Sequence, residues 1–145
     1  MKWIFYIGAI LVGIALGFQS PMNSALGKLT NPKNSAVLNN LLGLAILVLI
    51  STSDGSIRQF GSLFKAPIYL LLGGVLGATI VYLSIVVIPV IGAATFASII
   101  VTVQMVVTIF IDHYGLFGLP KTPVNWYRII GVIFMLIGIR LIKRF

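Results

Sequence analysis

The chain alternates between long apolar stretches and short polar ones. Five stretches have the roughly 17–25 mostly apolar residues that a membrane-spanning helix needs. They are residues 3–27, 35–51, 67–88, 91–111 and 124–142. Turn signals separate them, such as the Asn-Pro of "LTNPKNS" and the Gly- and Pro-rich "DHYGLFGLPKTP". The pattern therefore predicts an all-α integral membrane protein with five transmembrane helices in a single membrane domain, residues 1–145.

Two of these stretches admit another interpretation. The first could be a signal peptide cleaved after a small residue such as Ala25, but its apolar part exceeds the usual core of about 7–15 residues and four more stretches follow it. The second is short and contains Asn39 and Asn40, so it is either a thin, tilted span or a re-entrant segment. Between the second and third stretches, "STSDGSIRQFGSLFK" is predicted to be a polar loop.

The composition argues against a soluble protein. Hydrophobic residues make up 59% of the chain and charged residues 8%, whereas soluble domains are about a quarter charged. The net charge of +8 indicates loop bias and attraction to lipid head groups, because no basic cluster with interleaved aromatics suggests nucleic-acid binding. The absence of cysteine excludes disulfides, thiolate chemistry and zinc-finger spacing.

The basic residues divide equally between the two sides of the predicted membrane domain. The side of the N-terminus holds Lys2, Arg58, Lys65, Lys121 and Arg128, and the other side holds Lys28, Lys33, Arg140, Lys143 and Arg144. The positive-inside rule acts on an asymmetry between the sides, and five against five supplies none. Either other signals fix the orientation, or the chain inserts both ways round.

Two neutral amides and a proline interrupt the first apolar stretch in "GFQSPMNSALG". Gln19 and Asn23 are four residues apart and share a helix face. Pro21 cannot donate to the carbonyl of Gly17, so we expect a kink that leaves a bare acceptor. Broken backbone at membrane depth is typical of transporter cavities. The alternatives are that the amides hydrogen-bond neighbouring helices, worth about 0.6 kcal/mol on average, or that Asn23 faces lipid head groups.

Further candidate substrate contacts lie in the third and fourth stretches. Thr102 and Gln104 lie on two different polar faces of the fourth stretch, as on a helix between a cavity and a neighbouring helix. Gln104 is long, polar and mid-span, and we expect it to face the amides of the first stretch. Thr102 could instead satisfy a backbone carbonyl of its own helix. Tyr82 is either a ring that donates its hydroxyl into the cavity or an interfacial residue.

The one candidate for proton chemistry is the pair Asp112–His113, at the end of the fourth stretch. Because histidine titrates near neutrality, the pair is a possible gate or proton site; the alternative is an interfacial pair that fixes the start of the following turn. No Asp, Glu, Lys or His lies deep in a stretch, and amides cannot exchange protons. Proton-coupled export of cationic drugs is therefore disfavoured. The chain shows no catalytic constellation, so we expect no enzyme activity, metal or cofactor.

The fifth stretch carries a smooth stripe of small and flexible residues. Gly131 and Gly138 are seven residues apart, with Met135 between them. Such a stripe favours close packing between helices, here across a dimer interface, over contact with a substrate.

Two segments resemble the YdcZ-type family of the drug/metabolite transporter superfamily: "LGFQSPMNSALG" and "IGAATFASIIVTVQ…DHYGLFGLPKTPVNWYRIIGVIFMLIGIRLI". The resemblance covers nearly the whole chain, and its most specific parts are Gln19, Asn23 and "DHYGLFG". It implies a half-transporter of five helices in the plasma (inner) membrane of a prokaryote. Two such units pair in opposite orientations, as a homodimer or with a related five-helix chain, into a ten-helix transporter. This arrangement agrees with the equal division of charge.

Two functions fit these observations. The first is a small-solute transporter, an exporter, that works as an inverted dimer by alternating access around an amide-lined cavity. The second is a non-transporting membrane subunit that assembles with or regulates a partner membrane protein. Polar residues at depth favour the first, because a pure scaffold has no need to bury them. The expected partners are a second five-helix chain, the lipid bilayer and a small-molecule substrate, without nucleic acid.

Overall fold

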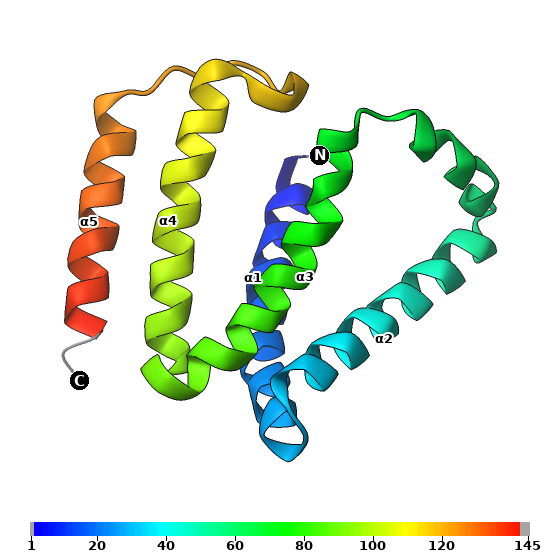
Figure 1. Ribbon diagram of the computed structural model, residues 1–145. Helices are drawn as coiled ribbons and strands as arrows, with labels where there is room; N and C mark the ends of the chain where they lie inside the picture. The colour runs from blue at the N-terminus through cyan, green and yellow to red at the C-terminus, as the bar shows by residue number, and fades with distance from the viewer. Residues whose placement is uncertain (1, 143–145) are drawn as a thin grey trace. The chain divides into compact units, whose positions relative to one another are not determined.

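Helices make up almost all of the chain in the computed structural model, which describes residues 2–142 (Figure 1). The elements are α1 (Lys2–Leu29), α2 (Pro32–Ser53), η1 (Ser56–Lys65), α3 (Ile68–Ile91), α4 (Ala93–Tyr114), η2 (Leu116–Gly118) and α5 (Trp126–Ile142), where η denotes a 3₁₀ helix. No strand occurs within the described range. The predicted all-α fold is therefore confirmed. Two residues of the charge count, Lys143 and Arg144, lie outside the described residues.

Four helices, α1 to α4, are long and apolar enough to cross a membrane. The second of them is one continuous helix of 22 residues, longer than the predicted stretch, so shortness no longer argues for a re-entrant segment. The described part of α5 has 17 residues, at the lower limit for a spanning helix. Its crossing of the membrane stays a prediction.

The ends of the helices follow local chemistry that the hydropathy pattern does not resolve. Asn31 caps α2, because its side-chain oxygen accepts a hydrogen bond from the backbone N–H of Asn34 at 2.9 Å. Pro32 then occupies the first turn, where a missing N–H costs nothing. Gly92, with a φ of 81°, makes the turn from α3 into α4. Helix α1 runs through Pro21 without interruption, and the kink expected there stays a prediction.

The segment predicted to be a polar loop, residues 51–65, is helical except at Asp54 and Gly55. Residues 56–65 form η1, and Gly55 introduces it with a left-handed φ of 75°. The Asp54 carboxylate accepts a hydrogen bond from the Ser56 N–H at 2.9 Å, and this bond lowers the pKa of Asp54 below its usual value. The prediction was wrong here because hydropathy averaged over the segment conceals a short helix with one apolar edge.

The chain divides into two compact units, Met1–Val90 and Ile91–Phe145. In the first unit, α1 and α2 form a hairpin whose helices meet at the turn and spread apart away from it (Figure 1). In the second unit, α4 and α5 run antiparallel and side by side. The expectation of one membrane domain over residues 1–145 stays a prediction.

The small core of the first unit lies where α1 meets α2 and α3. Its buried side chains are Asn23, Ser24, Ser35, Ala36, Ser84, Ile85 and Ile88. The Ser35 hydroxyl donates to the backbone carbonyl of Asn23 at 2.9 Å, which ties the two helices of the hairpin together. A Cβ at Gly27 would collide with the side chain of Ile85 and lie 3.7 Å from the Cα of Pro32. Glycine therefore lets three elements approach closely at this point.

We predict that Gly27→Val destabilises the protein by about 1–3 kcal/mol, because the new methyl groups have no space beside Ile85. Gly17→Val is the matched control, since a Cβ at Gly17 in the same helix meets no atom within 4 Å. Thermal unfolding of the detergent-solubilised variants measures the difference. Equal melting temperatures for both variants would contradict this packing.

Candidate functional site

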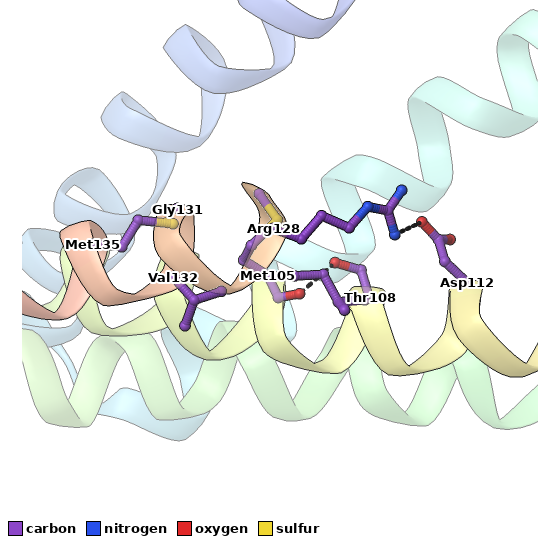
Figure 2. Close-up of a pocket in the computed structure, with 8 residues that line it drawn as sticks. Met105, Thr108, Asp112, Arg128, Gly131, Val132 and Met135 are labelled. Carbon is purple, nitrogen blue, oxygen red and sulfur yellow. Dashed lines mark hydrogen bonds and ion pairs between the residues drawn. The ribbon is translucent and has the colours of Figure 1, made fainter. Parts of the chain in front are cut away.

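A pocket of about 400 Å³ lies between α4 and α5 in the second unit (Figure 2). Its lining residues are Met105, Thr108, Ile109, Asp112, Arg128, Gly131, Val132 and Met135. One end is ionic, and the remainder is apolar apart from Thr108. The Thr108 hydroxyl is already used within its own helix, where it donates to the carbonyls of Gln104 and Met105 at 2.9 and 3.0 Å. The pocket therefore offers an apolar groove closed at one end by charge.

The ionic end is a salt bridge between Asp112, near the end of α4, and Arg128, in the first turn of α5. An Arg128 Nη1 donates to Asp112 Oδ2 at 3.2 Å, and both side chains are partly exposed, at 28% for Arg128 and 36% for Asp112. Figure 2 shows the guanidinium reaching along the hairpin to the carboxylate. A single contact of this kind leaves further guanidinium donors and the second carboxylate oxygen available. The site carries both signs of charge and no net charge.

The loop between α4 and α5 holds the two charged residues in register. The N–H of Thr122 donates to the backbone carbonyl of Asp112 at 2.8 Å, and the Asn125 side chain accepts from the N–H of Arg128 at 3.0 Å. At Gly115, φ is 65° and a Cβ would crowd Lys121. Local backbone geometry, rather than the salt bridge alone, therefore sets the position of Arg128 opposite Asp112.

Asp112 and His113 have different partners in the structure. While Asp112 pairs with Arg128, the His113 Nδ1 accepts a hydrogen bond from the N–H of Val124 at 3.3 Å. The imidazole ring also contacts Tyr114 edge-on, with centroids 4.8 Å apart. Both residues thus brace the α4–α5 loop. Their predicted role as a gate or proton site stays a prediction.

The stripe predicted for dimer packing lies partly inside this pocket. Gly131 and Met135 line it, and Gly138, one turn further along α5, does not. A Cβ at position 131 would meet no atom within 4 Å, so the glycine leaves space in the groove. Packing of this stripe across a dimer stays a prediction.

A second polar region belongs to the first unit and contains Asn23. This residue is 8% exposed, yet its side-chain amide forms no hydrogen bond within residues 2–142. Every fully buried side-chain nitrogen or oxygen in that range has a hydrogen-bond partner. Because the Asn23 amide has none, its nitrogen and oxygen must remain accessible to solvent. Asn23 is therefore a polar group recessed in a helix junction, with its hydrogen-bonding capacity unused.

The remaining predicted contacts fall into two classes. Thr102 is buried, at 3% exposure, whereas Gln19, Tyr82 and Gln104 are exposed. The amides of Gln19 and Gln104 form no hydrogen bond within the described part of the chain. The convergence of Gln104 on Gln19 and Asn23 stays a prediction, as does the role of each as a substrate contact.

Sequence reasoning missed Arg128 as a site residue, along with Met105 and Val132. Arg128 was counted only among the basic residues on one side of the membrane, although it follows the sole acidic residue near the fourth stretch by sixteen positions across a Gly- and Pro-rich turn. Opposite charges on the two sides of a predicted turn between helices are a signal that could have paired Asp112 with Arg128. Within residues 2–142, no group of three or more His, Cys, Asp or Glu side chains could hold a metal ion.

Comparison with known proteins gives one match. The family model described as "Putative inner membrane exporter, YdcZ" matches residues 4–141. No curated protein and no solved structure matches the chain. The family match covers nearly the whole chain and includes both polar regions described above.

We predict that Asp112 and Arg128 are energetically coupled by about 0.5–1 kcal/mol, as expected for a partly exposed ion pair. Asp112→Asn and Arg128→Gln should each lower the melting temperature, and the double variant should lose less than the sum. The exchanged pair Asp112→Arg with Arg128→Asp should recover part of the loss. Strict additivity of the single changes would show that the salt bridge contributes nothing.

Proposed function

The chain belongs to the YdcZ-type family of inner membrane exporters, and on this premise we propose that it exports a small solute without net charge. The protein is a multi-pass protein of the inner membrane. The proposal adds that α5 also crosses, that two chains pair in opposite orientations, and that an amide-lined cavity between them opens alternately to each side. The following observations support each part.

The observation that carries the proposal is the unpartnered amide of Gln104. This residue lies midway along α4, about 16 Å from the helix start at 1.5 Å per residue. Its side chain is exposed and has no hydrogen-bond partner within residues 2–142. In hydrocarbon, an amide without a partner costs several kcal/mol. Gln104 therefore needs a polar group outside its own unit or a watery path, and both are features of a transporter cavity.

Helix α1 presents a second set of free polar groups. Gln19 is exposed, Asn23 is recessed with a free amide, and the two share a helix face. Pro21 supplies no N–H to the carbonyl of Gly17. A Cβ at Gly17 would meet no atom within 4 Å apart from the backbone of its own helix. One and a half turns of α1 thus offer uncharged donors and acceptors. They suit a solute that carries polar groups without net charge.

The distribution of charge and of apolar surface supports an inverted pair. Basic residues number five on each side of five crossings, so the positive-inside rule gives no preferred orientation. Among the described residues the buried hydrophobic side chains are few: Ala36, Ile85, Ile88 and Phe96. Each unit by itself therefore leaves most of its apolar surface to lipid and to other helices, and a second chain would supply such helices. Pairing of opposite orientations would place equivalent amide-bearing helices on both sides of one cavity.

Proton coupling through a buried carboxylate is not part of the proposal. The chain has two acidic residues, Asp54 and Asp112. Asp54 follows the last residue of α2, and Asp112 lies near the end of α4 in a salt bridge with Arg128. Neither lies at the depth of Gln104. The solute gradient, or an ion bound by neutral oxygens, would then drive the cycle.

We predict that Gln19→Leu and Gln104→Leu remove solute flux and leave the protein folded and inserted, since a leucine side chain favours insertion of a helix into the membrane. A site that loses a buried hydrogen-bond partner is expected to lose about 1–3 kcal/mol of binding. Thr108→Val is the matched control, because the Thr108 hydroxyl is already satisfied within α4. A thermal-shift screen of uncharged metabolites identifies the solute, and flux into liposomes together with unfolding temperature gives the result.

Normal flux in both leucine variants would reduce the amides to contacts between helices. If no solute shifts the melting temperature, and loss of the protein instead impairs a co-purifying membrane protein, the non-transporting subunit is the better account. Gln19→Glu distinguishes the cases further. A carboxylate in the cavity would make flux depend on pH, whereas one at a static contact would change stability alone.

We also predict that two lysines added near either terminus fix the orientation of the chain, because a small excess of charge decides topology when the native count is equal. Variants fixed in opposite orientations should each be inactive and should restore flux when expressed together. A native C-terminus found on one side of the membrane only, with no related chain of opposite orientation, would contradict the inverted pair.

A further inference from the structure

The 3₁₀ helix η1 has a sequence period that matches its own geometry. A 3₁₀ helix has three residues per turn, so side chains at i and i+3 lie in line. One line consists of Ile57, Phe60 and Leu63, and a second of Gln59, Ser62 and Lys65. The third line holds Arg58, Gly61 and Phe64. Ten residues are long for this type of helix, and the alignment gives η1 one continuous apolar edge and one polar edge.

The apolar edge of η1 is uncovered by the protein. Phe60 and Leu63 are more than half exposed, and Phe64, which contacts Phe60 edge-on at 6.0 Å, is 78% exposed. No residue of η1 is buried. Exposed aromatic and aliphatic side chains that follow one edge of a helix mark a surface that is covered by the membrane or by another molecule.

The position of η1 in the chain indicates that the membrane covers its apolar edge. It joins the end of α2 to the start of α3 (Figure 1), and both of these helices are long and apolar enough to cross the membrane. At about 2 Å per residue, the ten residues of η1 span about 20 Å. Because this segment connects two crossings, it lies at the membrane surface. There an amphipathic helix lies flat, with its apolar side in the boundary between head groups and acyl chains.

We propose that η1 is a membrane-surface anchor that inserts its Ile57–Phe60–Leu63 edge below the lipid head groups and binds lipid phosphates through Arg58 and Lys65. This inference requires only that the protein spans the membrane, and it is independent of the transported solute.

The charges of η1 suit this role. Arg58 and Lys65 are exposed, and neither takes part in an ion pair within the described range. They lie near the two ends of η1, so they can reach phosphates on either side of the inserted edge. The nearby Asp54 is engaged by the Ser56 N–H at 2.9 Å. A phosphate-rich surface therefore complements η1, whereas an apolar protein surface would leave both cations without partners.

Aromatic residues gather at the same end of the membrane domain. With α1 to α4 crossing, the start of α1, η1, the start of α3 and the loop after α4 all lie at one surface. This surface carries both tryptophans and four of the five tyrosines: Trp3, Tyr6, Tyr69, Tyr114, Trp126 and Tyr127. Trp and Tyr concentrate at the level of the head groups. At the opposite surface, residues 26–36 and 88–96 hold a single aromatic, the buried Phe96.

The charge count of the two ends is equal, but their anchoring is therefore unequal. One end of each chain is fixed at the head-group level by η1 and the aromatic residues, whereas residues 26–36 and 88–96 at the other end carry no Trp or Tyr. In an inverted pair, each leaflet would receive one anchored end.

The test uses the full-length chain, which has no cysteine, so that single cysteines can carry a nitroxide label. Phe60→Cys places the label on the apolar edge, and Ser62→Cys places it on the polar edge as the matched control. Each labelled protein is reconstituted in phosphatidylcholine vesicles, with and without phosphatidylglycerol. Relaxation by oxygen, which concentrates in lipid, is compared with relaxation by a water-soluble nickel chelate.

We expect the label at position 60 to respond several-fold more to oxygen than to nickel, and the label at position 62 to show the reverse. Phosphatidylglycerol should increase the contrast at position 60. Arg58→Gln with Lys65→Gln should remove that increase, whereas Lys28→Gln with Lys33→Gln, at the other end of the membrane domain, should keep it. Leu63→Cys repeats the measurement in case the loss of Phe60 itself releases η1.

Three results would overturn the proposal. Equal access of nickel to positions 60, 62 and 63 would place η1 in water. Protection of position 60 or 63 from both reagents would place the apolar edge against protein, either a second copy or another chain. A phosphatidylglycerol effect that survives the loss of Arg58 and Lys65 would separate lipid binding from these cations.

Discussion

A polar group in the hydrocarbon of a membrane needs a hydrogen-bond partner, and the described part of this chain provides none for Gln19 or Gln104. The other polar side chains within the helices show how this requirement is usually met. The threonine hydroxyls at 52, 79 and 108 are satisfied within their own helices, so the free amides are not part of a generally unsatisfied surface. They mark the places where each unit, taken by itself, leaves a polar group without a partner.

The hydrogen bonds and ion pair that shape each unit lie near the ends of its helices. The bond from Ser35 to the carbonyl of Asn23 closes the α1–α2 hairpin near its turn, and the salt bridge between Asp112 and Arg128 closes the α4–α5 hairpin near its loop. Away from the α1–α2 turn, the two helices spread apart (Figure 1). The held turn would let α1 and α2 change neighbours away from it while the hairpin keeps its form, which would suit the alternating access proposed above.

The sequence predicted the helices well because a span of apolar residues has one stable form in a membrane. It predicted the environment of individual polar residues less well. Gln19 and Asn23 share a helix face, yet Asn23 is buried and Gln19 is exposed. The difference arises because Asn23 lies one turn nearer to the junction with α2 and α3, and periodicity along one helix carries no information on where the next helix crosses it. The same holds for Arg128, whose position opposite Asp112 depends on the backbone of the intervening loop. In η1, the informative period was three, and a search for periods of 3.6 and 2 passes over it.

The central claim is that two copies in opposite orientations complete the protein. Cross-linking of single-cysteine chains with a membrane-impermeant, bifunctional thiol reagent tests it most directly, because the native chain has no cysteine. Ser62, on η1, and Asn34, at the α1–α2 turn, are both exposed and mark opposite surfaces of one chain. Inverted copies bring position 62 of one chain and position 34 of the other to the same surface. The account therefore predicts cross-links between a Ser62→Cys chain and an Asn34→Cys chain. Cross-links between two Ser62→Cys chains, with none between Ser62→Cys and Asn34→Cys, would show parallel pairing and contradict it.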